Sequence, residues 1–346
     1  MIAPETLLRE MLEIPSLSGQ EEAIAALLVR RMGELPGFVA WRDEVGNAVG
    51  VVGDGPEEII LLGHMDTAPG QIPVRQEGAL LYGRGAVDAK GPLAAFISAV
   101  AQVGPRPGKR FIVVGAVEEE CPTSRGAHHI AARHRPVAAI IGEPSNWDRI
   151  TLGYKGSLVV QYVLEQEAAH FSGPNQSAAE KAVDFWLRAR EYAEQQSGGQ
   201  PRSFQTLDAT LRAIGSSSDG LRERAEATVA YRVPLGRSIA KLKAQFETWR
   251  GAGEVTFWNE EEPFQAPRNT PLVRAFLQAI RDEGGDPRFA LKHGTSDMNI
   301  VGPLWGCQIV AYGPGDSRLD HTPQEHISLA EYRKGIGVLV RVLQAL

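Results

Sequence analysis

Residues 58–67 read Glu-Ile-Ile-Leu-Leu-Gly-His-Met-Asp-Thr, a short apolar run followed at once by a His-x-Asp pattern. The apolar run predicts a buried β-strand over Glu58–Leu62. Residues i and i+2 of an extended chain share a face, so His64 and Asp66 point the same way where the strand ends. A carboxylate beside an imidazole fixes the proton on one ring nitrogen and leaves the other nitrogen to bind a metal ion. A solvated His and Asp in a loop would give the same pattern, so this motif does not decide alone.

Strand and helix patterns alternate on both sides of this motif. Further buried strands are predicted over Phe111–Val117, Val137–Ile141 and Gln308–Tyr312. Helices are predicted over Ala23–Met32, with Ser18 to Glu21 as an S-x-x-E capping box, and over Ala89–Val103, Arg125–His134, Pro271–Glu283 and Leu329–Leu346. This alternation predicts an α/β domain with helices on both faces of a mixed sheet.

The pattern changes in the middle of the chain, from residue 153 to residue 266. Strands are predicted there over Leu158–Glu165, Ser203–Ile214, Ala225–Val233 and Glu254–Trp258, and helices over Ser177–Gln195 and Ser238–Arg250. The order β-α-β-β-α-β is a complete ferredoxin-like α+β unit. We therefore expect one discontinuous α/β domain, 1–152 and 267–346, with a smaller domain inserted at 153–266.

Composition excludes several classes of function. The chain has 346 residues and a formal net charge of −6, with no basic field for nucleic acid. Hydrophobic residues make up 43% and charged residues 23%, as in globular proteins. No apolar run approaches the roughly 18 residues of a membrane span, and no signal-peptide pattern is visible. Two cysteines, Cys121 and Cys307, make no disulfide framework, so we expect a cytoplasmic protein.

Further potential ligands follow the other strands or begin a helix. They are Asp88 in the glycine-rich stretch 82–91, an acid among Glu118–Glu120, Glu143 and His321. Such positions gather at the carboxyl edge of an α/β sheet. Alone, Asp88 could be a helix N-cap and the acidic triplet a solvated turn. Together with His64 they suit two divalent ions, Zn²⁺ best, with Co²⁺ and Mn²⁺ left open. The remaining acid would act as general base.

These motifs, in this order, resemble the zinc-dependent family of deacylases and carboxypeptidases that includes acetylornithine deacetylase, succinyl-diaminopimelate desuccinylase, aminoacylase and the glutamate carboxypeptidases. The resemblance covers nearly the whole chain. It implies that His64, Glu143, His321 and a glutamate of the triplet are metal ligands and that Asp88 bridges two ions. It also implies that Asp66 is the catalytic partner of His64.

The acidic triplet allows two registers, because the family has two adjacent glutamates, the base first and the ligand second. Strand length makes Glu118 the base and Glu119 the ligand. If Glu118 instead replaces the Asp that usually precedes the pair, Glu119 is the base and Glu120 the ligand. We prefer the first register slightly, and Glu119 is functional in both.

The inserted domain resembles the family's dimerisation domain, which predicts a homodimer. Residues 169–172, Ala-His-Phe-Ser, are similar to a family motif whose His reaches the partner subunit's site and holds the substrate carbonyl. This gives His170 a catalytic role, although Phe171 departs from the motif and a surface histidine is the alternative. Arg232 resembles a position that contacts a substrate carboxylate; an ordinary ion-paired arginine is its alternative.

Residues 292–299, Lys-His-Gly-Thr-Ser-Asp-Met-Asn, resemble the branch of the family that releases lysine or ornithine from the C-terminal glutamate of the amino-group carrier protein LysW. Thr295 and Ser296 are assigned to substrate binding on this basis. The alternatives are a deacylase of free N-acyl amino acids, such as acetylornithine or acetyl-lysine, and a non-catalytic binding module. A dehydrogenase is excluded, because Gly83-Arg84-Gly85 lacks the third spaced glycine of a nucleotide site.

Overall fold

The computed structural model describes residues 3–168, 170 and 173–346, and these form two compact units. Unit 1 comprises Met1–Gly153, Gln265–Leu291 and Ser296–Leu346, and unit 2 comprises Tyr154–Phe264 and Lys292–Thr295. The segment Lys292–Thr295, which the sequence analysis placed in the discontinuous domain, packs with unit 2. Ala169, Phe171 and Ser172 of the predicted histidine motif lie outside the described residues.

Unit 1 is built on a large mixed sheet with the strand order β1-β2-β6-β3-β7-β15-β8-β13, and β14 also pairs with β8. The strands are β1 (Phe38–Arg42), β2 (Ala48–Val52), β3 (Glu57–His64), β6 (Lys109–Ala116), β7 (Ala138–Gly142), β8 (Arg149–Tyr154), β13 (Phe264–Gln265), β14 (Arg288–Lys292) and β15 (Gln308–Ala311). The central strands β6, β3, β7 and β15 are parallel, and β2 and β8 pair antiparallel on either side of them. The carboxyl ends of the parallel strands therefore meet at one edge.

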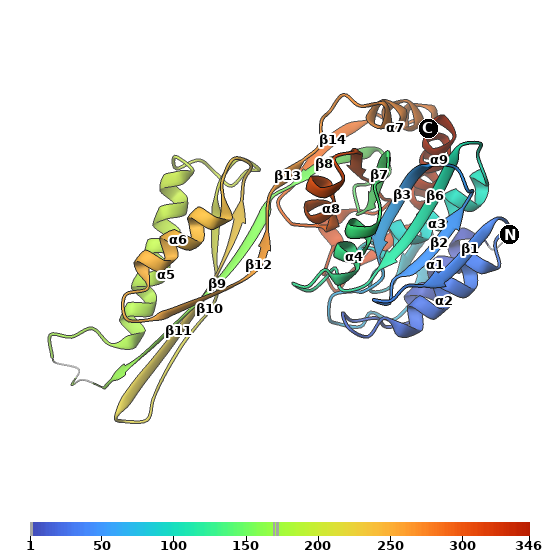
Figure 1. Ribbon diagram of the computed structural model, residues 1–346. Coiled ribbons are helices and arrows are strands. Elements are labelled where there is room, and N and C mark those ends of the chain that lie inside the picture. The colour runs from blue at the N-terminus through green and yellow to red at the C-terminus, as the bar shows by residue number, and fades with distance from the viewer. Residues whose placement is uncertain (1–2, 169, 171–172) are drawn as a thin grey trace. The chain divides into compact units, whose positions relative to one another are not determined.

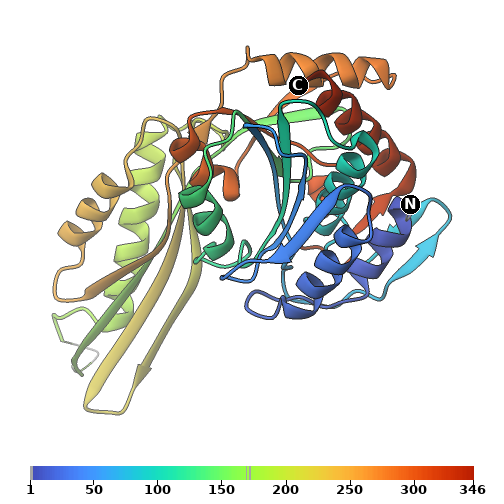
Figure 2. The same ribbon diagram turned by 45° about the vertical axis from the view of Figure 1, so that its right-hand side comes forward.

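Helices cover both faces of this sheet, as Figure 1 and Figure 2 show. They are α1 (Pro4–Leu12), α2 (Glu22–Gly33), α3 (Lys90–Val103), α7 (Pro271–Asp282) and α9 (Leu329–Ala345) on one face, and α4 (Arg125–Arg133) and α8 (Asp297–Trp305) on the other. Alternate residues of the strands supply the two cores: Ile59 and Leu61 of β3 pack into the core that contains α3 and α9. This alternation explains why the predicted strand is apolar at every position.

Smaller elements complete unit 1. A second sheet has the order β16-β5-β4, formed by β4 (Arg75–Glu77), β5 (Leu80–Tyr82) and β16 (His326–Ser328), and the 3-10 helix η1 covers Ser317–Leu319. The capping-box prediction at Ser18 is wrong. Helix α2 begins at Glu22 with Glu21 as its N-cap residue, because the hydroxyl of Ser18 donates to Oδ2 of Asp66 at 2.7 Å instead of capping the helix.

Unit 2 has the predicted β-α-β-β-α-β order. Its elements are β9 (Gly156–Glu167), α5 (Ala178–Gln196), β10 (Asp208–Ser218), β11 (Arg222–Val233), α6 (Ile239–Trp249) and β12 (Glu254–Glu261). The antiparallel sheet order β10-β11-β9-β12 is that of a ferredoxin-like fold. Both helices pack on one face, around a core that includes Leu158, Tyr231 and Phe246. Strand β10 continues past the predicted end at Ile214 to Ser218, and this last part of the strand is exposed.

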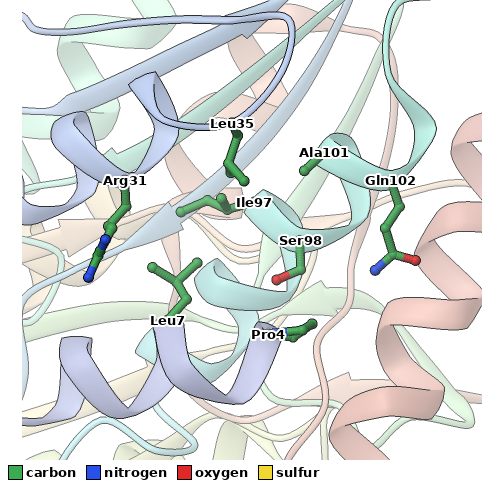
Figure 3. A pocket seen from close by; sticks show the side chains of 8 residues that line it. All are labelled: Pro4, Leu7, Arg31, Leu35, Ile97, Ser98, Ala101 and Gln102. Atoms are coloured by element: carbon green, nitrogen blue, oxygen red, sulfur yellow. The ribbon is translucent and has the colours of Figure 1, made fainter. Parts of the chain in front are cut away.

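A small cavity lies between α1, α2 and α3 of unit 1 (Figure 3). Its volume is about 20 Å³, which is enough for a single water molecule. It is lined by Pro4, Leu7, Arg31, Leu35, Ile97, Ser98, Ala101 and Gln102. It belongs to helix packing, since none of the residues predicted to be functional lines it. Among the described helices, none is long and apolar enough to cross a membrane.

Candidate metal centre

The parallel strands of unit 1 bring the predicted ligands to one edge of the sheet. His64 ends β3 and pairs in register with Ala116, so the acids that follow β6 lie beside it. Gly63 pairs with Gly142 of β7, which places Glu143 on the other side of His64. Asp88 precedes α3, and His321 follows β15 and η1. The five predicted positions therefore converge, although they are spread over most of the sequence.

His64 lies at the centre of the cluster and is buried. Its Nε2 atom is 3.3 Å from Oδ1 of Asp88, 3.9 Å from Oε2 of Glu119 and 4.0 Å from Oε1 of Glu143. His64, Asp88 and Glu143 form a group whose potential ligand atoms all lie within 4.8 Å of one another. Nitrogen and oxygen donors at these separations fit a divalent ion such as Zn²⁺.

A second group shares Asp88 with the first. Oδ2 of Asp88 is 3.0 Å from Nε2 of His321, and the same nitrogen is 3.0 Å from Oε1 of Glu120. Asp88, Glu120 and His321 again have ligand atoms within 4.8 Å of one another. Asp88 thus turns one carboxylate oxygen to each histidine, which is the arrangement of a ligand that bridges two ions. His321 is 53% exposed and lines a surface pocket of about 350 Å³, so the cluster opens to solvent on this side.

Asp66 is fully buried and joins His64 to the acidic triplet. Its Oδ1 atom is 3.4 Å from Nδ1 of His64 and accepts from the backbone N–H of Glu119 at 3.1 Å. Its Oδ2 atom accepts from the N–H of Glu120 at 3.0 Å and from the hydroxyl of Ser18 at 2.7 Å. Asp66 therefore orients the imidazole through its backbone carbonyl, 3.0 Å from Nδ1, together with its carboxylate, and the carboxylate also fixes the backbone of both glutamates that face the cluster.

Glu118 points away from the cluster. Its backbone has φ of 62°, a left-handed conformation that turns the chain at the end of β6. Oε1 of Glu118 pairs with Nη2 of Arg125 at 2.7 Å, and Oε2 accepts from the hydroxyl of Thr123 at 2.5 Å. The structure thus brings together Glu119 and Glu120, the pair of the second register given above, and leaves out Glu118, the base of the preferred one.

The cluster carries more negative than positive charge. Burial raises the pKa of Glu119 well above its ordinary value, and the nearby carboxylates of Glu143, Asp297 and Glu120 raise it further. Hydrogen bonds to Asp88 and Glu120 raise the pKa of His321 to about 10. Two histidines thus face several carboxylates in this cluster. Carboxylates held this close are relieved by divalent cations, so the donor set and its charge both fit a pair of ions.

The predicted substrate-binding residues are placed differently. Ser296 is the N-cap of α8 and accepts from the N–H of Met298, whereas Thr295 is half-buried in unit 2. His170 is exposed and also lies in unit 2. Arg232, on β11 of unit 2, has its Nη1 atom buried without a hydrogen-bond partner among the described residues. Burial and the neighbouring Arg212 lower the pKa of Arg232.

Sequence reasoning missed Glu325, which is completely buried beside the cluster. Its carboxylate accepts from the N–H of Asp88 at 3.2 Å. An acid in a polar stretch after Pro323 gives no signal of burial, because its partners lie more than two hundred residues earlier in the chain. Ser18 was noticed, but as a helix cap.

Comparison with known proteins places the chain in a family. The sequence description of peptidase family M20/M25/M40 matches residues 60–345. The chain belongs to this family. Among its curated relatives, the LysW-lysine hydrolase of Deinococcus radiodurans is 46% identical, over 99% of this chain and 97% of that protein. The LysW-lysine/LysW-ornithine hydrolase of Saccharolobus islandicus is 31% identical, over 86% of this chain and 83% of the relative.

Solved structures of the M20 family share the fold. An M20 family metallo-carboxypeptidase from Sulfolobus solfataricus aligns with a TM-score of 0.79 at 19% identity, covering 99% of both chains. The aminopeptidase PepT of Bacillus cereus aligns with a TM-score of 0.77 at 16% identity, also covering 99% of both chains. The predicted architecture, an α/β domain with helices on both faces of a mixed sheet and a ferredoxin-like insertion, is therefore confirmed.

Proposed function

We propose that this M20 enzyme is a metal-dependent amide hydrolase that releases lysine, ornithine or both from the C-terminal glutamate of a LysW-type carrier protein. Full-length similarity to LysW-lysine hydrolase, at 46% identity, carries this proposal. The converging acids and histidines of unit 1 supply a site for the chemistry. The same similarity supports a carrier protein, rather than a free acylated amino acid, as the substrate.

We assign the ligands from the two groups that share Asp88. His64 and Glu143 would hold one divalent ion and Glu120 and His321 the other, with Asp88 as the ligand common to both groups. Zn²⁺ is our proposal for both, because two imidazoles and three carboxylates suit it. When bound, the ions provide Lewis-acid activation of the amide carbonyl and of the attacking water.

Glu119 is left in the cluster as the proton-transferring group. Its carboxylate takes a proton from the attacking water and returns it to the nitrogen of the leaving amine. Burial and neighbouring acids raise its pKa, which makes its carboxylate a stronger base than that of an exposed glutamate. Asp66 keeps this acid in place through its backbone N–H and orients His64.

Unit 2 contributes to substrate binding in this proposal. The buried, unpartnered Nη1 atom of Arg232 is a donor that a substrate carboxylate would satisfy. The resemblance of unit 2 to the family's dimerisation domain supports a homodimer, with His170 at the partner's site and Thr295 and Ser296 near the substrate. A cytoplasmic location accompanies this biosynthetic role.

Mass spectrometry of a purified carrier–lysine conjugate tests the function. We expect the enzyme to remove one lysyl unit from the carrier, and an excess of chelator to stop the reaction until Zn²⁺, Co²⁺ or Mn²⁺ is restored. A carrier–ornithine conjugate, free acetyl-lysine and free acetylornithine are assayed in parallel. Rapid turnover of the free acetylated amino acids with none of either conjugate would refute the proposal and favour the deacylase.

A further inference from the structure

The loop that carries Asp88 is held by Glu325, a buried acid that belongs to neither of the two groups of proposed metal ligands. Oε1 of Glu325 accepts from the backbone N–H of Val87 at 2.9 Å and from that of Asp88 at 3.2 Å. The conformation of this loop requires glycine at position 85: its φ is +86°, and a Cβ atom there would lie 2.8 Å from Cγ2 of Thr67. The carboxylate of Glu325 thus fixes the backbone from which the shared ligand projects.

Arg84 completes this arrangement from the other side of the same loop. Its Nη1 atom donates to Oε2 of Glu325 at 2.8 Å and, at 3.5 Å, to the backbone carbonyl of Thr322, the residue after His321. Its Nε atom donates to the carbonyl of Gly70 at 2.9 Å. Arg84 and Glu325 therefore tie the Asp88 loop to the His321 segment, although the two segments are more than two hundred residues apart.

The energetics of this pair favour a positional role. The Glu325 side chain is 0% exposed and that of Arg84 13% exposed. Removing two charges from water costs about as much as their attraction returns, so a buried pair adds little net stability over apolar residues of similar size. What the pair does provide is geometry, because Glu325 accepts two backbone N–H bonds at Val87 and Asp88, while Arg84 donates to the carbonyl beside His321.

We propose that Glu325 and Arg84 are positioning residues that hold Asp88 and His321 at the spacing required to share a pair of divalent ions. The inference rests on the metal centre of the proposed function but not on the identity of the substrate. The ion between Asp88, Glu120 and His321 depends on it most, because both loops that the pair joins supply ligands to that ion. Partners of metal ligands commonly contribute about 10- to 100-fold to metal affinity.

Zinc titration of the full-length, metal-free protein tests this role without an activity assay. Glu325→Gln keeps one acceptor oxygen for the backbone but presents an amide N–H₂ to Arg84, and Arg84→Met leaves the carboxylate without its cation. The matched control is Glu58→Gln. Glu58 is likewise an ion-paired acid of unit 1, though it is only partly buried; it pairs with Arg110 and with His134 at 3.2 Å, and it lies at the opposite end of β3 from His64.

We expect both site variants to bind the second zinc ion about 10- to 100-fold more weakly than the wild type, whereas E58Q binds both ions normally. The absorption spectrum of the Co²⁺-loaded variants should also change, which a mere loss of folding stability would not produce. A cooperative thermal unfolding transition, measured in the presence of chelator, shows which of the metal-free variants are folded. If E325Q does not fold, R84M decides the matter, since its side chain is partly exposed.

Two results would overturn the proposal, and they differ in what else they refute. Folded site variants with zinc affinities within about twofold of E58Q, and with an unchanged Co²⁺ spectrum, would refute the positioning role alone. A wild-type protein that binds no zinc would refute the metal centre together with it.

Discussion

Replacement of Glu119 by Gln is the sharpest test of how the site works. The amide keeps the size of the side chain and its place beside His64, but it cannot accept a proton at neutral pH. General acid–base catalysis contributes about 10²- to 10⁴-fold, which is about 3 to 5 kcal/mol of transition-state stabilisation. We therefore expect E119Q to lose activity by this factor while it still binds two ions.

The neighbouring acids give contrasting controls. Glu118 pairs with Arg125, whose side chain is 52% exposed, and such a surface pair contributes at most about 1 kcal/mol, so E118Q should keep its rate within about fivefold. Glu120 lies 3.0 Å from Nε2 of His321, so E120Q should lose metal affinity. Single-turnover rates and zinc stoichiometry, measured on the same preparations, separate the two effects. An inactive E118Q that retains both ions would refute our assignment and restore the register in which Glu118 is the base.

Three further changes test other parts of the molecule. Asp66→Asn places an N–H₂ group where a backbone N–H now donates to the carboxylate, so that two donors face each other. We expect kcat to fall about 10- to 100-fold in steady-state assays. An unchanged kcat would contradict the role of Asp66. Arg232→Met should lower kcat/KM about 10- to 100-fold and leave zinc binding intact, because it removes a charged donor to the substrate. A loss of zinc affinity as large as the loss in kcat/KM would contradict this role. Burial raises the pKa of Glu261 from 4.5 to about 7, so the folded state retains a proton that the unfolded state has lost. The stability that depends on this proton is complete below the unfolded pKa and is lost as pH rises through about 7. Relative to the wild type, the free energy of unfolding of Glu261→Gln should therefore increase by ~1 kcal/mol between about pH 5 and pH 8. Thermal unfolding measures this difference, and parallel pH curves for the two proteins would refute it.

The sequence was sufficient to locate most of the centre because strand ends are local features. The apolar run before His64 and the one before Glu143 each predicted a buried strand, and parallel pairing then requires their ends to meet. The alternation of strands and helices likewise predicted both folds. The edge strand Phe38–Arg42 and its neighbour Ala48–Val52 were missed, although they are short apolar runs separated by a turn that contains Gly46 and Asn47.

The register of the triplet could not be predicted, because distant residues determine it. Strand β6 ends at Ala116, and the left-handed turn at Glu118 follows from contacts made elsewhere. Glu21 accepts the N–H of Glu118 at 3.1 Å, while Asp66 accepts those of the next two residues. The hydroxyl of Ser18 illustrates the same limit, since it could accept an N–H at a helix N-terminus or donate to a carboxylate, and only the folded chain brings Asp66 within reach.

Single carboxylates in this centre serve several groups at once, and this affects how substitutions are interpreted. Asp88 faces both histidines, and Asp66 contacts His64 as well as the backbone of Glu119. A change at Asp66 therefore alters the imidazole that holds one ion and the acid that moves the proton. The effects of substitutions within such a network do not add. The loss caused by D66N thus includes part of the loss caused by E119Q, and neither measures the contribution of one residue alone.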